Sequence, residues 1–150
     1  MVVQERQAGF AGTHLMQIDP SAFVADSELL RALEKRSTAV PCEGDRVLFR
    51  QGDAPLGLYI LERGHATLTM ASNGSESVFA MPAEPGSLLG LPGLAGNKPY
   101  TLTATAHAGA QVRFVTRENF TALMQSEPGI SLKILQVLAA EVRSARRAIF

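Results

Sequence analysis

The central part of the chain, from Val40 to Thr116, consists of short apolar runs separated by turn residues. The run "RVLFRQGD" is typical of a strand that closes at Gly52 and Asp53, and "LGLYILERG" alternates until it stops at Gly64. At least six such strands are expected in this part, with no helix between them. A series of short strands without helices predicts an antiparallel β-barrel or sandwich.

Two longer stretches supply the remaining strands of this prediction. "HATLTMASNGSESVFAM" is typical of a hairpin, because Asn73 and Gly74 provide a tight turn between two apolar runs. "TLTATAHAGAQVRFVT" contains two further β-rich runs, which Ala108 and Gly109 separate. We therefore expect a mainly β fold with helices only at its two flanks.

The N-terminal flank divides into an arm and a helix. Residues 1–26 have weak periodicity and many small side chains, which predicts a partly ordered arm. "SELLRALEKRSTAV" predicts a helix, with Ser27 as its N-cap and its end between Arg36 and Thr38. We accordingly expect an arm over 1–26 and a single domain over 27–150.

The C-terminal flank is predicted to hold two helices. In "TRENFTALMQSEP", Thr116 is the expected N-cap, with Asn119 three residues later, and Pro128 ends the segment. A long helix then follows over about 129–150, with an apolar stripe of about two heptads. This stripe, which could pack on the chain's own strands or on a second copy, consists of Leu135, Leu138, Val142, Ala145 and Ile149.

Composition excludes several classes of function. The 14 basic and 14 acidic residues cancel, so no overall charge favours binding to nucleic acid. One cysteine, Cys42, excludes an internal disulfide and cysteine-based metal sites. The first residues include Glu5 and Arg6 where a signal peptide needs an apolar core, and no apolar run is long enough to cross a membrane. We expect a cytoplasmic protein.

The residues that most often carry catalysis or metals are scattered. His14, His65 and His107 lie far apart, and no spacing of His, Cys, Asp and Glu resembles a metal-ligand set. Glu43 and Asp45 flank Gly44, which is typical of a solvated turn. Because no nucleophile elbow is present either, we expect neither an enzyme nor a bound metal.

The glycines of "GDRVLFRQGDAPLGLYILERGHATL" carry a resemblance to a known family. The stretch resembles the β-roll signature of the cyclic-nucleotide-binding domain found in catabolite-activator-type (Crp/Fnr) regulators. The matching positions are Gly44, Phe49, Gln51-Gly52-Asp53, Leu58-Tyr59-Ile60 and Gly64. The resemblance extends over 27–150 and implies an antiparallel, jelly-roll-like β-roll (a double-stranded β-helix) between an N-terminal helix and a long C-terminal helix. It also implies a homodimer that forms through that last helix.

The segment "EPGSLLGLPGLAGNKPYTLTATA" lies where the family has its phosphate-binding cassette. The resemblance implies a Gly-Glu pair that holds the ribose and an Arg about ten residues later that neutralises the phosphate. Gly90 matches the glycine, but Leu91 stands at the glutamate and Tyr100 (or Pro99, in a shifted register) at the arginine. The other cassette positions are Pro92, Gly93, Lys98 and Thr101, and we expect Lys98 to face solvent rather than replace the arginine.

These substitutions predict a non-enzymatic sensor module with a degenerate cassette. Cyclic nucleotide is the one cofactor that the resemblance implies, and we expect it not to bind in the usual way. We call the loop around Gly90 and the residues that face it the cradle. With Leu91 and Tyr100 in place of the charged residues, this cradle would be apolar and would hold a hydrophobic or aromatic effector, or else be filled by its own side chains. In full-length regulators of this kind a DNA-binding domain follows, so the alternative is the ligand-sensing fragment of such a regulator. We expect a stand-alone module that binds neither DNA nor membranes by itself.

Overall fold

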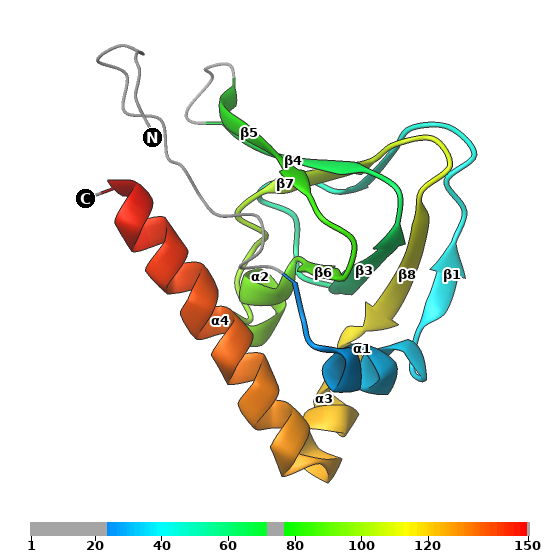
Figure 1. Ribbon diagram of the computed structural model, residues 1–150, viewed down its shortest axis with the longest axis vertical. Helices are drawn as coiled ribbons and strands as arrows, with labels where there is room; N and C mark the ends of the chain where they lie inside the picture. Colours follow the sequence, from blue (N-terminus) through cyan, green and yellow to red (C-terminus); the bar gives the residue numbers. More distant parts are fainter. Residues whose placement is uncertain (1–23, 72–76, 150) are drawn as a thin grey trace.

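The computed structural model describes residues 24–71 and 77–149, and its side chains are described except in 77–79 and 144–149. In these ranges eight strands form two four-stranded antiparallel sheets, which together make the roll in the upper right of Figure 1. In chain order the strands are β1 (Thr38–Val40), β2 (Arg46–Phe49), β3 (Gly57–Arg63), β4 (Ala66–Ala71), β5 (Ser77–Ala83), β6 (Ser87–Leu89), β7 (Thr103–Ala106) and β8 (Gln111–Thr116).

The sheets pair segments that are far apart in the sequence. One sheet has the order β1-β8-β3-β6 and the other β2-β7-β4-β5. The predicted hairpin is confirmed, because β4 and β5 pair with Leu68 opposite Met81; its turn at Asn73 and Gly74 lies outside the described residues. The predicted mainly β fold with flanking helices is therefore confirmed.

Helix α1 (Ser27–Glu34) begins and ends at different residues from those predicted. Its N-cap is Asp26 rather than Ser27, because a carboxylate oxygen of Asp26 accepts a hydrogen bond from the Leu29 amide at 2.8 Å. The helix ends before 36–38, because Thr38–Val40 pairs with β8 as an edge strand. Val24 already bridges to Ser87, while the rest of the predicted arm, 1–23, lies outside the described residues.

A short helix, α2 (Leu91–Gly96), lies between β6 and β7, where the sequence analysis expected none. Its two glycines and one proline give it low helix propensity. Pro92 is tolerated in the first turn, where its missing N–H has no partner in a helix. Burial of Leu91 and Leu94 then stabilises a turn that local sequence does not favour.

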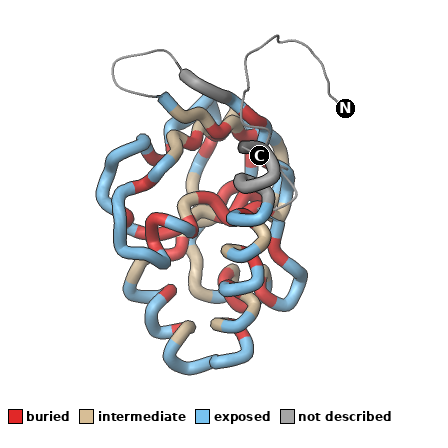
Figure 2. Tube along the Cα trace, turned by 90° about the vertical axis from the view of Figure 1, so that its left-hand side faces the viewer, coloured by how far each residue is buried: buried red, intermediate tan, exposed pale blue. Residues whose placement is uncertain are grey.

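The chain has two apolar cores, one on each side of the first sheet. Side chains of β3 alternate between them: Leu61 and Tyr59 belong to the core inside the roll, and Leu58 and Ile60 to the core under the helices. Figure 2 shows buried residues gathered through the middle of the molecule, where strands and helices meet. The alternating run in β3 therefore reflects two buried faces rather than one buried and one solvated face.

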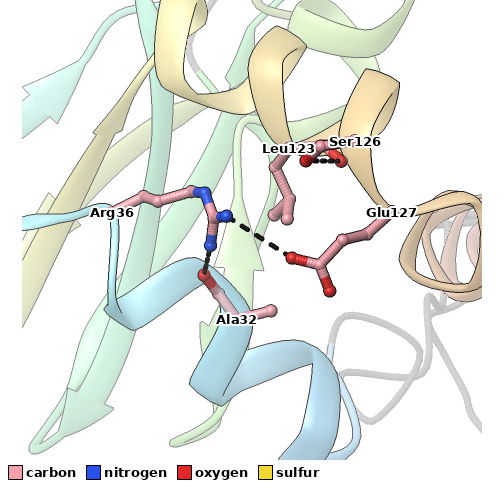
Figure 3. Close-up of polar contacts among 5 residues, drawn as sticks. All are labelled: Ala32, Arg36, Leu123, Ser126 and Glu127. Carbon is pink, nitrogen blue, oxygen red and sulfur yellow. Dashed lines mark hydrogen bonds and ion pairs between the residues drawn. The ribbon is translucent and has the colours of Figure 1, made fainter.

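Helices α3 (Arg117–Ser126) and α4 (Pro128–Ile149) follow the roll. The predicted cap of α3 is confirmed, because the Thr116 hydroxyl accepts a hydrogen bond from the Asn119 amide at 3.1 Å. At the junction with α4, the Arg36 guanidinium lies between the carbonyl of Ala32 at 3.2 Å and the carboxylate of Glu127 at 3.4 Å (Figure 3). This contact joins the end of α1 to the start of α4.

Helix α4 runs along the left side of Figure 1. Part of its apolar surface is exposed. Leu138 packs against the core under the helices, whereas Leu135 and Val142 are 61% and 53% exposed. The predicted stripe is therefore divided between the chain's own core and the surface, and the side chains of Ala145 and Ile149 lie outside the described ones. No helix in the described ranges has the length and hydropathy needed to cross a membrane.

Candidate functional site

The segment that follows β6 forms a tight loop around Gly90. This residue has a positive φ of 89° and precedes α2, whose first turn donates the Leu94 amide to the Gly90 carbonyl at 3.1 Å. A Cβ added at Gly90 would approach the ring of Tyr100 to 2.8 Å. Glycine is thus required both by the left-handed backbone and by the aromatic ring above it.

Tyr100 turns its side chain into the roll and is 4% exposed. Its hydroxyl donates to the carbonyl of Gly57 at 2.6 Å and accepts from the Gly57 amide at 3.3 Å. Its ring stacks on Phe49, with centroids 4.0 Å apart and an interplanar angle of 24°. Burial raises the pKa of Tyr100 above its usual value, so the phenol is neutral.

The backbone of Tyr100 is fixed as firmly as its ring. Its carbonyl accepts from the Gly52 amide at 2.8 Å, and its amide donates to the Asp53 carbonyl at 3.0 Å. Gln51, which follows β2, reaches β4, because its side-chain amide pairs with both backbone groups of Ala71 at 2.9 Å. The Gln51-Gly52-Asp53 signature therefore fixes the backbone on both sides of the Tyr100 peptide groups.

The structure does not bring the predicted apolar cassette residues into one pocket. Leu91 is fully buried and, with Leu94, belongs to the core under the helices, whereas Tyr100 belongs to the core inside the roll. Pro92, Lys98 and Thr101 are exposed. Of the predicted cassette side chains, only Tyr100 reaches the space beside Gly90.

Gly93 closes the loop on its far side. A Cβ there would approach the carbonyl oxygen of Lys98 to 2.9 Å, so the two backbone segments touch. The amide of Lys98 donates to the carbonyl of Gly93 at 2.9 Å. The Lys98 backbone therefore belongs to the loop, while its ammonium group is exposed to solvent.

Arg117 is a cation near the cradle that the sequence analysis missed. Its guanidinium donates to the side-chain oxygen of Asn97 at 2.6 Å and to the carbonyl of Pro55 at 2.5 Å. Its charge is a minor influence that lowers the pKa of Tyr100. No local pattern marks this arginine, because strand β8 and the loop before β3 come together only in the folded chain.

The other described residues that the sequence analysis considered make local contacts or lie at the surface. Cys42 is buried, with its sulfur 3.6 Å from the carbonyl of Val40. His107 contacts the hydroxyl of Thr67 at 2.7 Å, and His65 is exposed. Asp45 accepts a hydrogen bond from the Ala108 amide at 2.9 Å. In the described part of the chain no three His, Cys, Asp or Glu side chains gather as a metal site would require; His14 lies outside it.

Comparisons with known proteins agree with this fold. The family model of the cyclic nucleotide-binding domain matches residues 39–127. The catabolite activator protein of Thermus thermophilus superimposes with a TM-score of 0.69 at 22% identity, over 87% of this chain and 62% of that one. This chain thus spans less than two thirds of the Thermus protein.

This chain matches most of the length of two further structures. The N-terminal domain of a transcriptional regulator from Streptomyces coelicolor A3(2) has a TM-score of 0.62 at 21% identity, over 87% of this chain and 92% of that one. A cyclic nucleotide-binding-like protein from Brucella abortus has a TM-score of 0.55 at 26% identity, over 66% and 84%. A search of curated proteins finds no match. The chain belongs to the cyclic nucleotide-binding domain family and has the fold of catabolite-activator-type regulators.

Proposed function

We propose that this domain is a non-enzymatic, cytoplasmic regulatory module whose cradle is filled by Tyr100, so that no cyclic nucleotide binds there in the family's usual way. The observation that carries the proposal is the Tyr100 ring itself. It lies over Gly90, stacks on Phe49 and bonds to Gly57 through its hydroxyl. A ligand phosphate would have to displace a side chain that already satisfies these contacts.

The charges around the cradle support the same proposal. A cyclic phosphate is a monoanion, and burying it without a paired cation is unfavourable. Lys98 is exposed and Arg117 is bound to Asn97 and Pro55. A missing charge-assisted hydrogen bond costs about 1.5–3 kcal/mol, which lowers affinity by one to two decades. An apolar or aromatic effector would avoid that cost but would still have to displace the Tyr100 ring.

Isothermal titration with cAMP and with cGMP tests the proposal. We expect no saturable heat at micromolar ligand, because the Tyr100 ring would have to move and, among the described residues, Lys98 is exposed and Arg117 is bound to Asn97 and Pro55. Micromolar or tighter binding to either nucleotide would contradict the closed cradle and leave the fold assignment intact.

Helix α4 is the proposed dimer interface. Leu132 and Leu135 are 56% and 61% exposed and lie three positions apart on one face, near Val142. A second copy that packs on this row would bury all three side chains. Light scattering at a protein concentration of tens of micromolar measures the oligomeric state. We expect a dimer in the wild type and a monomer after Leu135→Lys.

The alternative function is the sensing part of a transcription regulator. It is favoured by the coverage of the comparisons, since the chain spans 62% of the Thermus catabolite activator protein but 92% of a regulator's isolated N-terminal domain. Any DNA-binding helices would then lie outside this chain. The reading frame beyond Phe150 distinguishes the two functions, because a downstream helix-turn-helix would favour the regulator.

A further inference from the structure

The inner face of α4 carries a carboxyl group among apolar side chains. Ile130, Ile134, Val137 and Glu141 follow at spacings of four, three and four, which places them on one helical face. Each of these four residues is at most 9% exposed. The first three pack in the core under the helices, and Glu141 occupies the next inward position, where an apolar side chain would be expected.

Glu141 is buried, and one of its two carboxyl oxygens lacks a hydrogen-bond partner in the described part of the chain. The residue is 7% exposed, and its Oε2 atom has no partner among the described residues. Burying an ionised, unpaired carboxylate is far more costly than burying the neutral acid. Burial raises the pKa of Glu141 to about 8, so the group is mostly neutral at pH 7 when the helix is docked.

The charged groups on the elements that pack against α4 do not explain this state. Burial is the cause of the raised pKa, and no neighbouring charge in the described part contributes to it. Helix α2 has no charged side chain, and Arg143 on α4 itself is exposed. Most of the remaining charged groups contact one another: Asp26 and Glu28 with Lys133, Glu127 with Arg36, and Glu34 with Glu62. Arg117 contacts Asn97. The other four are exposed to solvent: Arg31, Lys35, Lys98 and Glu118.

We propose that Glu141 is a proton-operated latch for α4. With the carboxyl neutral, Glu141 stays docked together with the apolar inner face of α4, and with the carboxyl ionised, the part of α4 from Glu141 onward leaves the domain. Val142, the last residue of the exposed row Leu132, Leu135 and Val142, lies in the released part, so the latch also changes how that end of the row is presented to a partner. This regulation does not depend on whether the cradle binds a nucleotide.

The direction and size of the effect follow from proton linkage. An undocked Glu141 is solvated and titrates near 4.5, whereas the docked group titrates near 8. Docking therefore takes up a proton between these values, and the undocked fraction rises as the pH rises. The docking equilibrium changes by about tenfold per pH unit in this window and is constant above it.

Hydrogen exchange along α4 tests the latch. Protection factors of the amides from Glu141 onward, corrected for intrinsic exchange, are measured between pH 5.5 and 8.5 in the wild type and in Glu141→Gln. We expect protection to fall by about tenfold per unit in the wild type up to about pH 8. The variant, whose amide cannot ionise, should show no such slope.

Two further variants make the result decisive. Glu118→Gln removes an exposed glutamate of α3 and should keep the wild-type slope. Glu141→Met keeps a similar volume and replaces the glutamine variant if that one does not fold. Wild-type protection that is independent of pH, or an equal slope in Glu141→Gln or Glu141→Met, would overturn the proposal.

Discussion

The hydroxyl of Tyr100 satisfies both backbone groups of Gly57 at a buried position. The sequence analysis expected a neutral residue at the position of the family's arginine, and the sequence alone identifies that residue. The sequence does not determine the direction of the side chain, because an aromatic ring at this point could face solvent, the roll or the helices. Stacking on Phe49 and the polar groups of Gly57 together select the roll.

Replacing Tyr100 with Phe should test that arrangement. The change removes one hydroxyl and leaves buried backbone groups of Gly57 with fewer partners, while the ring can still stack. We expect a loss of about 1–3 kcal/mol in the free energy of unfolding. Urea denaturation followed by circular dichroism measures it, since the chain has no tryptophan.

Tyr59→Phe is the matched control. Tyr59 belongs to the same aromatic group, 5.8 Å from Phe49 by ring centroids, but it is only half-buried. Its change should cost less than that of Tyr100. Equal losses in the two variants would show that the Gly57 contacts do not hold Tyr100 in place.

Helix α1 is joined to α4 at both of its ends. Asp26 caps α1 and also bonds to the ammonium of Lys133 at 2.8 Å, while Arg36 contacts Glu127 at 3.4 Å. The hydrogen bond from Lys133 holds the pKa of Asp26 below its usual value, so this contact is present at neutral pH and is lost as the pH falls through that lowered value. The sequence predicts a capped helix here, but the partner 107 positions away is known only from the fold.

Substitutions at Asp26 should separate its two roles. Asp26→Ala removes the cap and the ion pair, and we expect a loss of about 0.5–2 kcal/mol in the free energy of unfolding. Asp26→Asn keeps an oxygen that can cap the helix and loses only the charge, so it should resemble Lys133→Met. If Asp26→Asn were as destabilising as Asp26→Ala, the ion pair rather than the cap would dominate.

The whole molecule is organised by the first sheet, which has a core on each face. Helix α2 comes directly from the cradle and contributes Leu91 and Leu94 to the same core as Ile134 and Val137 of α4. A structural change at the cradle can therefore alter the packing of α4 through this shared core. Glu141 is also buried on α4, and the raised pKa that burial gives it makes its protonation contribute to the stability of the folded state.

This contribution predicts how global stability depends on pH. The folded state holds a proton on Glu141 that the unfolded chain releases above about pH 4.5, so the contribution of this group to stability is fully present below that value and is lost as the pH rises to about 8. The slope expected from this group is at most about 1.4 kcal/mol per pH unit. The pKa of Glu34, raised by its hydrogen bond to Glu62, adds a slope of the same sign.

Urea denaturation at a series of pH values between 5 and 9 measures this slope. Glu141→Gln should remove most of it and should be more stable than the wild type at pH 9. A stability that rises between pH 5 and 8 would show that Glu141 is ionised in the folded protein.

The sequence by itself determined the class of fold, the hairpin of β4 and β5, the cap of α3 and the absence of an arginine in the cassette. These features depend on local chemistry: alternation, turn glycines, a capping hydroxyl and the identity of one residue. Only the tertiary structure decided that Leu91 and Tyr100 enter different cores, that Leu138 faces inward, that α2 is helical and that Glu141 is buried. Each of these depends on which layer covers each face of a strand or helix. The spacing of residues within one segment does not determine which other segment packs on that face.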